Sequence, residues 1–191
     1  MYTVDSIKKK GDRFIVTISG DDTRTISLDE GAIIEYSLMR GASLTDDAVD
    51  AVMELDERYR AYLKVLRILS YGDKSQRALK DRLIYEGFST TAAEDALLMA
   101  AQYGYVNEGR QVRSIATRLA NRDLRSPRFI VAKLCKDGYD ESLVDSVISA
   151  LTLSGEVDFD EVGDKLCEKL GVTDPDERRI LLIKRGFIEE D

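Results

Sequence analysis

The sequence contains no histidine and no tryptophan, and it has only two cysteines and two prolines among its 191 residues. Without histidine, histidine-based catalytic triads and most zinc sites are excluded. Cys135 and Cys167 are far apart in the sequence, and each lies on the apolar side of an expected helix, where a thiol is usually a small core residue. The sequence therefore predicts neither a disulfide framework nor a metal or cofactor site.

Long hydrophobic runs are also lacking. No apolar segment approaches the roughly 20 residues that a membrane-spanning helix needs, and no signal peptide opens the chain. From this we expect a soluble, cytoplasmic protein.

Signatures of enzymes are missing as well. The glycines between Gly104 and Gly109 lack the Lys-Ser/Thr pair of a phosphate-binding loop, and no expected strand precedes them. Acidic pairs such as Asp21-Asp22 and Asp46-Asp47 fall at expected turns and helix starts, where solvated carboxylates are common. We therefore expect the protein not to be an enzyme and to bind no small-molecule substrate.

The net charge of −8 is unevenly distributed. Residues 1–60 carry 8 basic and 13 acidic side chains, residues 61–140 carry 14 and 9, and residues 141–191 carry 6 and 14. A basic middle thus lies between two acidic ends, and this asymmetry is more informative about binding partners than the total charge.

One segment of the chain is repeated. Residues 75–88 recur as residues 126–139, and a weaker third copy spans residues 174–187. A period near fifty residues is typical of tandem supersecondary units. The residues that define the repeat are Ser75, Leu83, Gly87, Phe88, Ser126, Leu134, Gly138, Tyr139, Gly186 and Phe187.

Each copy has the start and stop signals of one helix. Ser75, Ser126 and Asp174 are expected to cap the free N–H groups of the first turn. Both prolines of the chain occupy the first helical position, where the missing N–H costs nothing. The glycines of the three copies suit a left-handed backbone after the last helical residue.

The coarse pattern predicts the fold class. Residues 2–7, 13–19 and 24–28 alternate like short strands, and helical periodicity follows from residue 29 onward. We expect a mainly α protein, an elongated array of tandem three-helix repeats behind a small N-terminal antiparallel β meander. The expected parts are a β meander or hairpin (1–28), a helical lead-in (29–58, with helices over 29–39 and from 45 onward), repeat 1 (59–108), repeat 2 (109–157) and a truncated repeat 3 (158–191). The expected helices of the repeats span residues 59–69, 76–85, 91–103, 110–121, 127–136, 141–153, 160–170 and 175–184.

The middle of the chain is rich in arginine with few compensating acids, since Asp123 is the single acidic residue between Arg110 and Arg128. Guanidinium groups pair well with phosphate or carboxylate groups. We therefore predict a filament- or DNA-binding surface, called here the basic face. Its members are Arg110, Arg113, Arg118, Arg122, Arg125, Arg128, Lys74, Arg77 and Lys80.

The order of these features resembles the RecX family of recombination regulators. The segment Lys74-Ser75-Gln76-Arg77, followed by Leu79, Arg82, Leu83 and Gly87-Phe88, is similar to the family's serine-initiated central helix. Gly104-Tyr105-Val106-Asn107-Glu108 resembles its Gly-Tyr-Leu-Asp-Asp element. The chain departs from the family where Gln76 and Pro127 replace the usual glutamate after the serine.

The resemblance implies a regulator of recombination, DNA repair and the SOS response. Its expected partner is the RecA filament on single-stranded DNA, with the DNA itself as a further candidate, and it would lie in the filament groove. There it would limit RecA's ATPase, strand-exchange and co-protease activities. Two other functions stay open: a direct DNA-binding regulator of helix-turn-helix type, and a helical-repeat adaptor whose arginines meet an acidic peptide.

Overall fold

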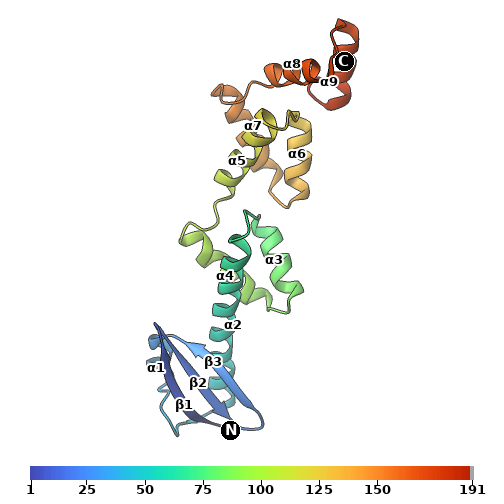
Figure 1. The fold of residues 1–191 in the computed structure, drawn as a ribbon. Coiled ribbons are helices and arrows are strands. Elements are labelled where there is room, and N and C mark those ends of the chain that lie inside the picture. Colours follow the sequence, from blue (N-terminus) through green and yellow to red (C-terminus); the bar gives the residue numbers. More distant parts are fainter. Residues whose placement is uncertain (190–191) are drawn as a thin grey trace. The chain divides into compact units, whose positions relative to one another are not determined.

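The computed structural model describes residues 1–189, so Glu190 and Asp191, the last two residues of the predicted third repeat, lie outside the described part. Residues 1–189 form nine helices and one four-stranded sheet near the N-terminus (Figure 1). The prediction of a mainly helical protein with a small N-terminal antiparallel sheet is confirmed.

The chain divides into two compact units. The first unit consists of Met1–Tyr71 and Lys80–Tyr103, and the second contains Gly72–Leu79 and the residues from Gly104 onward. Each unit has a hydrophobic core of its own, around the sheet in the first and among the helices in the second.

The sheet of the first unit has the strand order β3-β2-β1-β4, and all of its strand pairs are antiparallel. Its strands are β1 (Tyr2–Lys10), β2 (Arg13–Ser19), β3 (Thr23–Leu28) and β4 (Ser43–Leu44). The predicted alternation holds, because Val4, Val16 and Ile18 are completely buried on one face. The expected meander accounts for β1 to β3 only. Strand β4 was missed because two residues are too few to show a period.

Helix α1 (Glu30–Glu35) is shorter than the predicted helix over residues 29–39. Asp29 caps it by accepting a hydrogen bond from the Ala32 backbone N–H at 2.8 Å. The helix ends early because Ser37 adopts a left-handed backbone with φ of 49°, which turns the chain toward β4. The prediction of a longer helix is therefore wrong.

Helix α2 (Asp46–Leu69) is uninterrupted over 24 residues, so the expected division between residues 58 and 59 falls within one helix. Thr45 caps it as predicted, accepting from the Ala48 N–H at 3.3 Å. The first part packs on the sheet through Val49 and Val52. A later part, with the buried Ala61 and Val65, packs against α4 (Thr90–Gln102).

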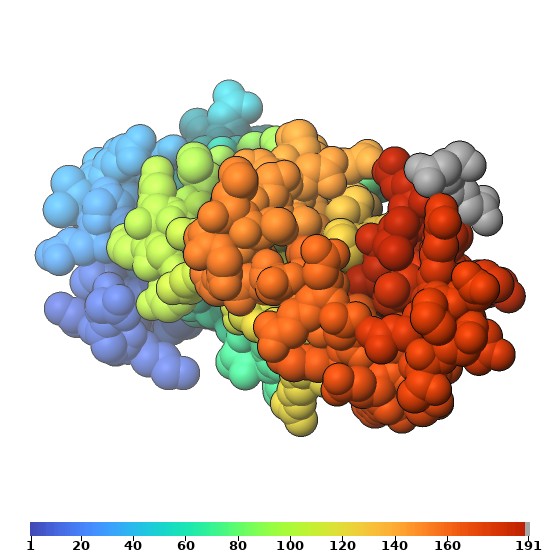
Figure 2. Space-filling model, turned by 90° about the horizontal axis from the view of Figure 1, so that it is seen from above, coloured from blue at the N-terminus to red at the C-terminus, as the bar shows by residue number. Residues whose placement is uncertain are grey.

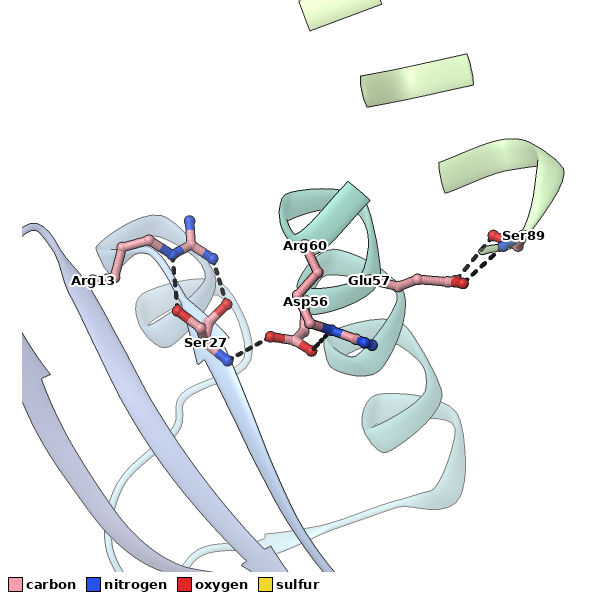
Figure 3. A network of polar contacts seen from close by, with 6 residues as sticks. All are labelled: Arg13, Ser27, Asp56, Glu57, Arg60 and Ser89. Carbon is pink, nitrogen blue, oxygen red and sulfur yellow. Dashed lines mark hydrogen bonds and ion pairs between the residues drawn. The ribbon is translucent and has the colours of Figure 1, made fainter. Parts of the chain in front are cut away.

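A buried carboxylate joins α2 to the sheet (Figure 3). Asp56 is only 6% exposed; its Oδ1 accepts the Ser27 backbone N–H at 2.7 Å and its Oδ2 accepts Arg60 Nε at 2.7 Å. Arg13 holds the same strand residue, donating from Nε to Ser27 Oγ at 3.2 Å and from Nη2 to the Ser27 carbonyl. Because β3 is an edge strand, this N–H has no partner within the sheet, and Asp56 supplies one.

Replacing Asp56 with alanine is expected to lower the free energy of unfolding of the first unit by about 1–3 kcal/mol, because the Ser27 N–H loses its acceptor. Asp56→Asn is the matched control, since its amide oxygen can still accept that hydrogen bond. Urea unfolding followed by far-UV circular dichroism measures both variants. An equal loss in the two would show that the ion pair with Arg60, rather than the bond to the strand, stabilises this contact.

The second unit holds five complete helices: α5 (Glu108–Asn121), α6 (Pro127–Lys136), α7 (Glu141–Leu153), α8 (Phe159–Leu170) and α9 (Pro175–Arg185). Each begins and ends within two residues of its predicted position. The core is aliphatic, with Ile130, Leu134, Val144 and Leu151 completely buried. In Figure 2, which views the chain from above, α8 and α9 lie together in the foreground in orange and red.

The remaining helix, α3 (Gln76–Tyr85), contributes its first residues to the second unit and the rest to the first. The cysteines lie as predicted on helix sides that face the core: Cys167 is fully buried and Cys135 is half-buried. Burial, followed by repulsion from Glu141, raises the pKa of the Cys135 thiol. Both cysteines are free thiols.

Candidate functional site

The central helices α3 and α6 begin with the same kind of segment. Lys74-Ser75-Gln76-Arg77 starts one, and Arg125-Ser126-Pro127-Arg128 starts the other. Both serines cap their helices as predicted, because Ser75 Oγ accepts the Ala78 N–H and Ser126 Oγ accepts the Phe129 N–H, each at 3.2 Å.

The serine hydroxyls make a second bond that the sequence did not indicate. Ser75 Oγ donates to the carbonyl of Asp137 at 2.7 Å, and Ser126 Oγ donates to the carbonyl of Arg185 at 2.6 Å. Each serine thus connects the start of one central helix to the end of the next, and both serines are nearly inaccessible to solvent. We call this contact the serine–glycine seam, after the glycines that follow those carbonyls.

The glycines after the central helices have the predicted left-handed backbone, with φ of 91° at Gly87, 92° at Gly138 and 79° at Gly186. Two of them also allow a close approach across the seam. A Cβ added at Gly138 would lie 2.7 Å from Ser75 Oγ, and one at Gly186 would lie 3.0 Å from the Cβ of Arg128. Gly87 has open space around it, so only its backbone conformation favours glycine.

The aromatic residues after these glycines close each helix end. The backbone N–H groups of Phe88, Tyr139 and Phe187 donate back to the carbonyls of Leu83, Leu134 and Leu182 at 3.1, 3.1 and 2.9 Å. This six-residue return is the Schellman pattern, which satisfies the last carbonyls of a helix. Tyr139 is the most buried of the three aromatics.

The Tyr139 hydroxyl donates to Gln111 Oε1 at 3.1 Å within the core of the second unit. Burial, reinforced by the negative charges of Asp73, Glu108 and Asp137, raises the pKa of Tyr139 to about 12. The phenol therefore stays protonated near neutral pH and keeps its hydrogen bond. Tyr139 and Gln111 have a structural role rather than a chemical one.

The structure separates the residues predicted for the basic face into two groups. Arg113 pairs with Glu156, Nε to Oε2 at 3.1 Å, and Lys80, in the first unit, pairs with Glu94 at 2.6 Å. The other seven are exposed and form no ion pair with any residue in 1–189. They are Lys74, Arg77, Arg110, Arg118, Arg122, Arg125 and Arg128.

The starts of α3 and α6 lack the acidic residues that most of the other helices have in their first turns. Neither helix has an acidic residue in its first turn, whereas α8 and α9 each have two. Arg77 and Arg128 instead place a cation near the positive end of the helix dipole, which is unfavourable for an isolated helix. Such a cation, together with the neighbouring Lys74 or Arg125, is well placed to bind an anionic group on a partner.

Within residues 1–189, no group of three or more histidine, cysteine, aspartate or glutamate side chains is positioned to hold a metal ion. None of the helices in that part of the chain is long and apolar enough to cross a membrane. What the described residues offer for binding is the exposed positive charge of the basic face.

Comparison with known proteins gives the same assignment from sequence and from fold. No family model matches the chain. The regulatory protein RecX of Oceanobacillus iheyensis is 23% identical over 185 residues, which cover 96% of this chain and 67% of that protein. A crystal structure of a regulatory protein RecX superposes with a TM-score of 0.71 at 22% identity, covering 98% of this chain and 92% of that one. The chain is similar to RecX proteins over nearly its full length and has the fold of a RecX crystal structure.

Other RecX proteins extend the comparison. The RecX of Limosilactobacillus reuteri is 23% identical over 188 residues, which cover 97% of this chain and 69% of that protein. The crystal structure of RecX from Lactobacillus salivarius gives a TM-score of 0.61 at 17% identity, and the match covers 71% of this chain and 91% of that one. The match to the RecX of Listeria innocua covers 74% of this chain and 52% of that protein. The chain thus spans between about half and 69% of the length of the three RecX proteins compared by sequence. RecX is a family of regulatory proteins, so the prediction that this protein is not an enzyme is confirmed.

Proposed function

We propose that this protein regulates recombination and DNA repair in the cytoplasm by binding the RecA filament on single-stranded DNA. It inhibits the filament's ATPase, strand-exchange and co-protease activities without catalysing a reaction of its own. The observation that carries the proposal is the set of seven exposed cations of the basic face that form no ion pair within residues 1–189.

The repetition of the helix starts supports this proposal. A filament presents the same surface at regular intervals, and a binding protein benefits from equivalent contacts spaced along its own chain. The basic segments that start α3 and α6 are such equivalents, since both have a buried serine cap, a preceding cation and an exposed arginine two residues after the serine. Phosphate oxygens of DNA and carboxylates of RecA are both suitable ligands.

The third copy does not continue the basic pattern. Asp174-Pro175-Asp176 stands where the second copy has Ser126-Pro127-Arg128, and Asp174 caps α9 by accepting from the N–H groups of Asp176 and Glu177. We infer that binding of anionic groups involves the starts of α3 and α6 and not the start of α9.

Reversing two charges of the basic face is expected to weaken binding to RecA filaments by roughly tenfold or more at low salt. We choose Arg118→Glu with Arg122→Glu, because both arginines are exposed and form no ion pair with a described residue. Arg113 is a poorer choice, since Arg113→Glu would place two carboxylates together at Glu156. If the two arginines contact phosphates, the slope of the logarithm of the binding constant against the logarithm of the salt concentration should also decrease by about two, one for each lost contact.

The control is Arg40→Glu with Arg67→Glu, which makes the same change in net charge at exposed positions of the first unit. Co-sedimentation with RecA is measured with and without single-stranded DNA, and circular dichroism verifies that the helices are kept. Equal losses in the two double variants would reject the basic face as the binding surface. Binding to bare DNA but not to RecA would instead favour a direct DNA-binding regulator.

A further inference from the structure

The second unit has a cavity of about 250 Å³ beside the serine–glycine seam. It is formed by the loop between α5 and α6, the first turn of α6, and the last turns of α8 and α9. The apolar residues that line it are Leu124, Phe129, Leu166, Leu170 and Phe187. The polar ones are Asp123, Arg125, Ser126, Lys169 and Arg185.

The apolar part of this cavity is open to a partner. Phe129 is 40% exposed and Leu170 is 50% exposed, although both are large side chains at the edge of a packed core. The Arg125 guanidinium lies 4.6 Å from the centre of the Phe129 ring, which keeps that cation beside the apolar surface. Exposed apolar residues within a concave site indicate a binding surface more strongly than the same residues scattered singly.

The cavity is cationic although this part of the chain is acidic. Arg125, Lys169 and Arg185 line it against the single acid Asp123, whereas residues 141–191 carry 6 basic and 14 acidic side chains. None of the three cations forms an ion pair with a described residue. The dipoles of α8 and α9 favour Lys169 and Arg185 at their C-terminal ends. The dipoles do not explain why these two helix ends and Arg125 come together at one cavity.

The walls of the cavity are held in place by the backbone. Leu124 adopts a left-handed conformation with φ of 51°, which is uncommon for a residue other than glycine. Hydrogen bonds from its N–H to the Ala120 carbonyl at 3.1 Å, and from the Arg125 N–H to the Leu119 carbonyl at 3.0 Å, maintain it. The bond from Ser126 Oγ to the Arg185 carbonyl links the α6 wall to the α9 wall. The site is therefore largely formed before any partner binds.

We propose that this cavity docks an acidic segment of a partner protein, with one large apolar side chain inserted beside Phe129 and carboxylates on Arg125, Lys169 and Arg185. The volume suits one inserted side chain and is below the roughly 300 Å³ at which small-molecule pockets begin. Half of the lining is apolar, whereas single-stranded nucleic acid calls for a cationic groove that follows its backbone. The inference goes beyond the proposed function, because the cavity is a different surface from the basic face. The two surfaces have only Arg125 in common.

The test measures binding of a fluorescein-labelled peptide, Asp-Glu-Leu-Phe-Asp-Glu, by fluorescence polarisation with the full chain. Lys169→Glu is expected to weaken binding roughly tenfold, because it replaces an attraction by a repulsion at the cavity. Lys184→Glu is the matched control. It makes the same change in the last turn of α9, at an exposed residue that does not line the cavity, and it should leave the affinity unchanged. A peptide with serines in place of leucine and phenylalanine should not bind.

A second measurement does not depend on any variant. Titrating the unmodified protein with the peptide should shift the NMR signals of Phe129, Leu166 and Phe187, and not those of the first unit. The absence of peptide binding, or equal affinities in Lys169→Glu and Lys184→Glu, would overturn the proposal. So would binding of oligo(dT) in place of the peptide, which would assign the cavity to nucleic acid. A dimer that dissociates in Lys169→Glu without peptide binding would assign it to a second copy of the chain.

Discussion

Replacing Gly138 with alanine is expected to lower the free energy of unfolding of the second unit by roughly 2–4 kcal/mol. Two costs add at this position. The left-handed backbone, with φ of 92°, costs about 1 kcal/mol for a residue that has a Cβ. The new methyl group would also lie 2.7 Å from Ser75 Oγ, and making room for an extra carbon in a packed contact costs about 1–3 kcal/mol.

Ser75 has little freedom to avoid this clash. Its hydroxyl accepts the Ala78 N–H and donates to the Asp137 carbonyl, so a movement that relieves the contact weakens the helix cap or the bond across the seam. The neighbouring atoms, Arg77 Cβ at 3.4 Å and the Ala78 backbone nitrogen at 3.6 Å, limit the other directions.

Gly87→Ala is the matched control for this prediction. Gly87 ends the equivalent helix with φ of 91°, yet nothing lies within 4 Å of an added Cβ. Its substitution should cost about 1 kcal/mol, from the backbone conformation alone. Urea unfolding followed by circular dichroism measures both variants, and equal losses would show that the seam can adjust and that contact with Ser75 does not constrain the glycine.

Local signals explain why the helices could be predicted from the sequence. Serine, aspartate and proline at the starts, and glycine followed by an aromatic at the ends, act within a few residues of their own position. The N–H of Tyr139 returns to Leu134 and that of Phe88 to Leu83 because the same short pattern occurs in both copies. Where the local signal is weak, as in the two residues of β4, the prediction failed.

The partners of polar side chains could not be predicted, because they depend on residues distant in the sequence. Ser75 and Asp137 are 62 residues apart, and Arg113 and Glu156 are 43 apart. The sequence indicated that a serine would cap its own helix, but not that its hydroxyl would donate to the end of the next one. It likewise indicated an arginine-rich helix without showing that Arg113 already has a carboxylate partner.

The cavity in the second unit was missed for the same reason. Its lining comes from three segments between Asp123 and Phe187, and the repeat pattern that includes Ser126 and Phe187 does not indicate that these segments meet. The charge count pointed away from it, because residues 141–191 are strongly acidic as a whole. The local charge of a surface depends on which few side chains the fold brings together, and a sum over a segment does not reveal it.

The protein is expected to suppress most of the ATP hydrolysis by RecA on single-stranded DNA and to hydrolyse no ATP by itself. The chain has no histidine, and residues 1–189 contain no cluster of metal-ligating side chains. Under the proposed function, an effect on ATP turnover acts through contact with RecA. The measurement is the steady-state ATPase rate of RecA on a long single strand, titrated with the protein at fixed salt.

The shape of that titration distinguishes two modes of inhibition. If the protein blocks filament growth, inhibition should be complete at ratios well below one per RecA protomer, and electron microscopy should show shorter filaments. If it coats the filament, roughly stoichiometric amounts should be needed and the filaments should keep their length. The Arg118→Glu, Arg122→Glu variant should shift either curve to higher concentrations, whereas the Arg40→Glu, Arg67→Glu control should not. Full ATPase activity at equimolar protein, with filaments of unchanged length, would reject the proposed regulation of RecA, while peptide docking in the cavity of the second unit would still be testable independently.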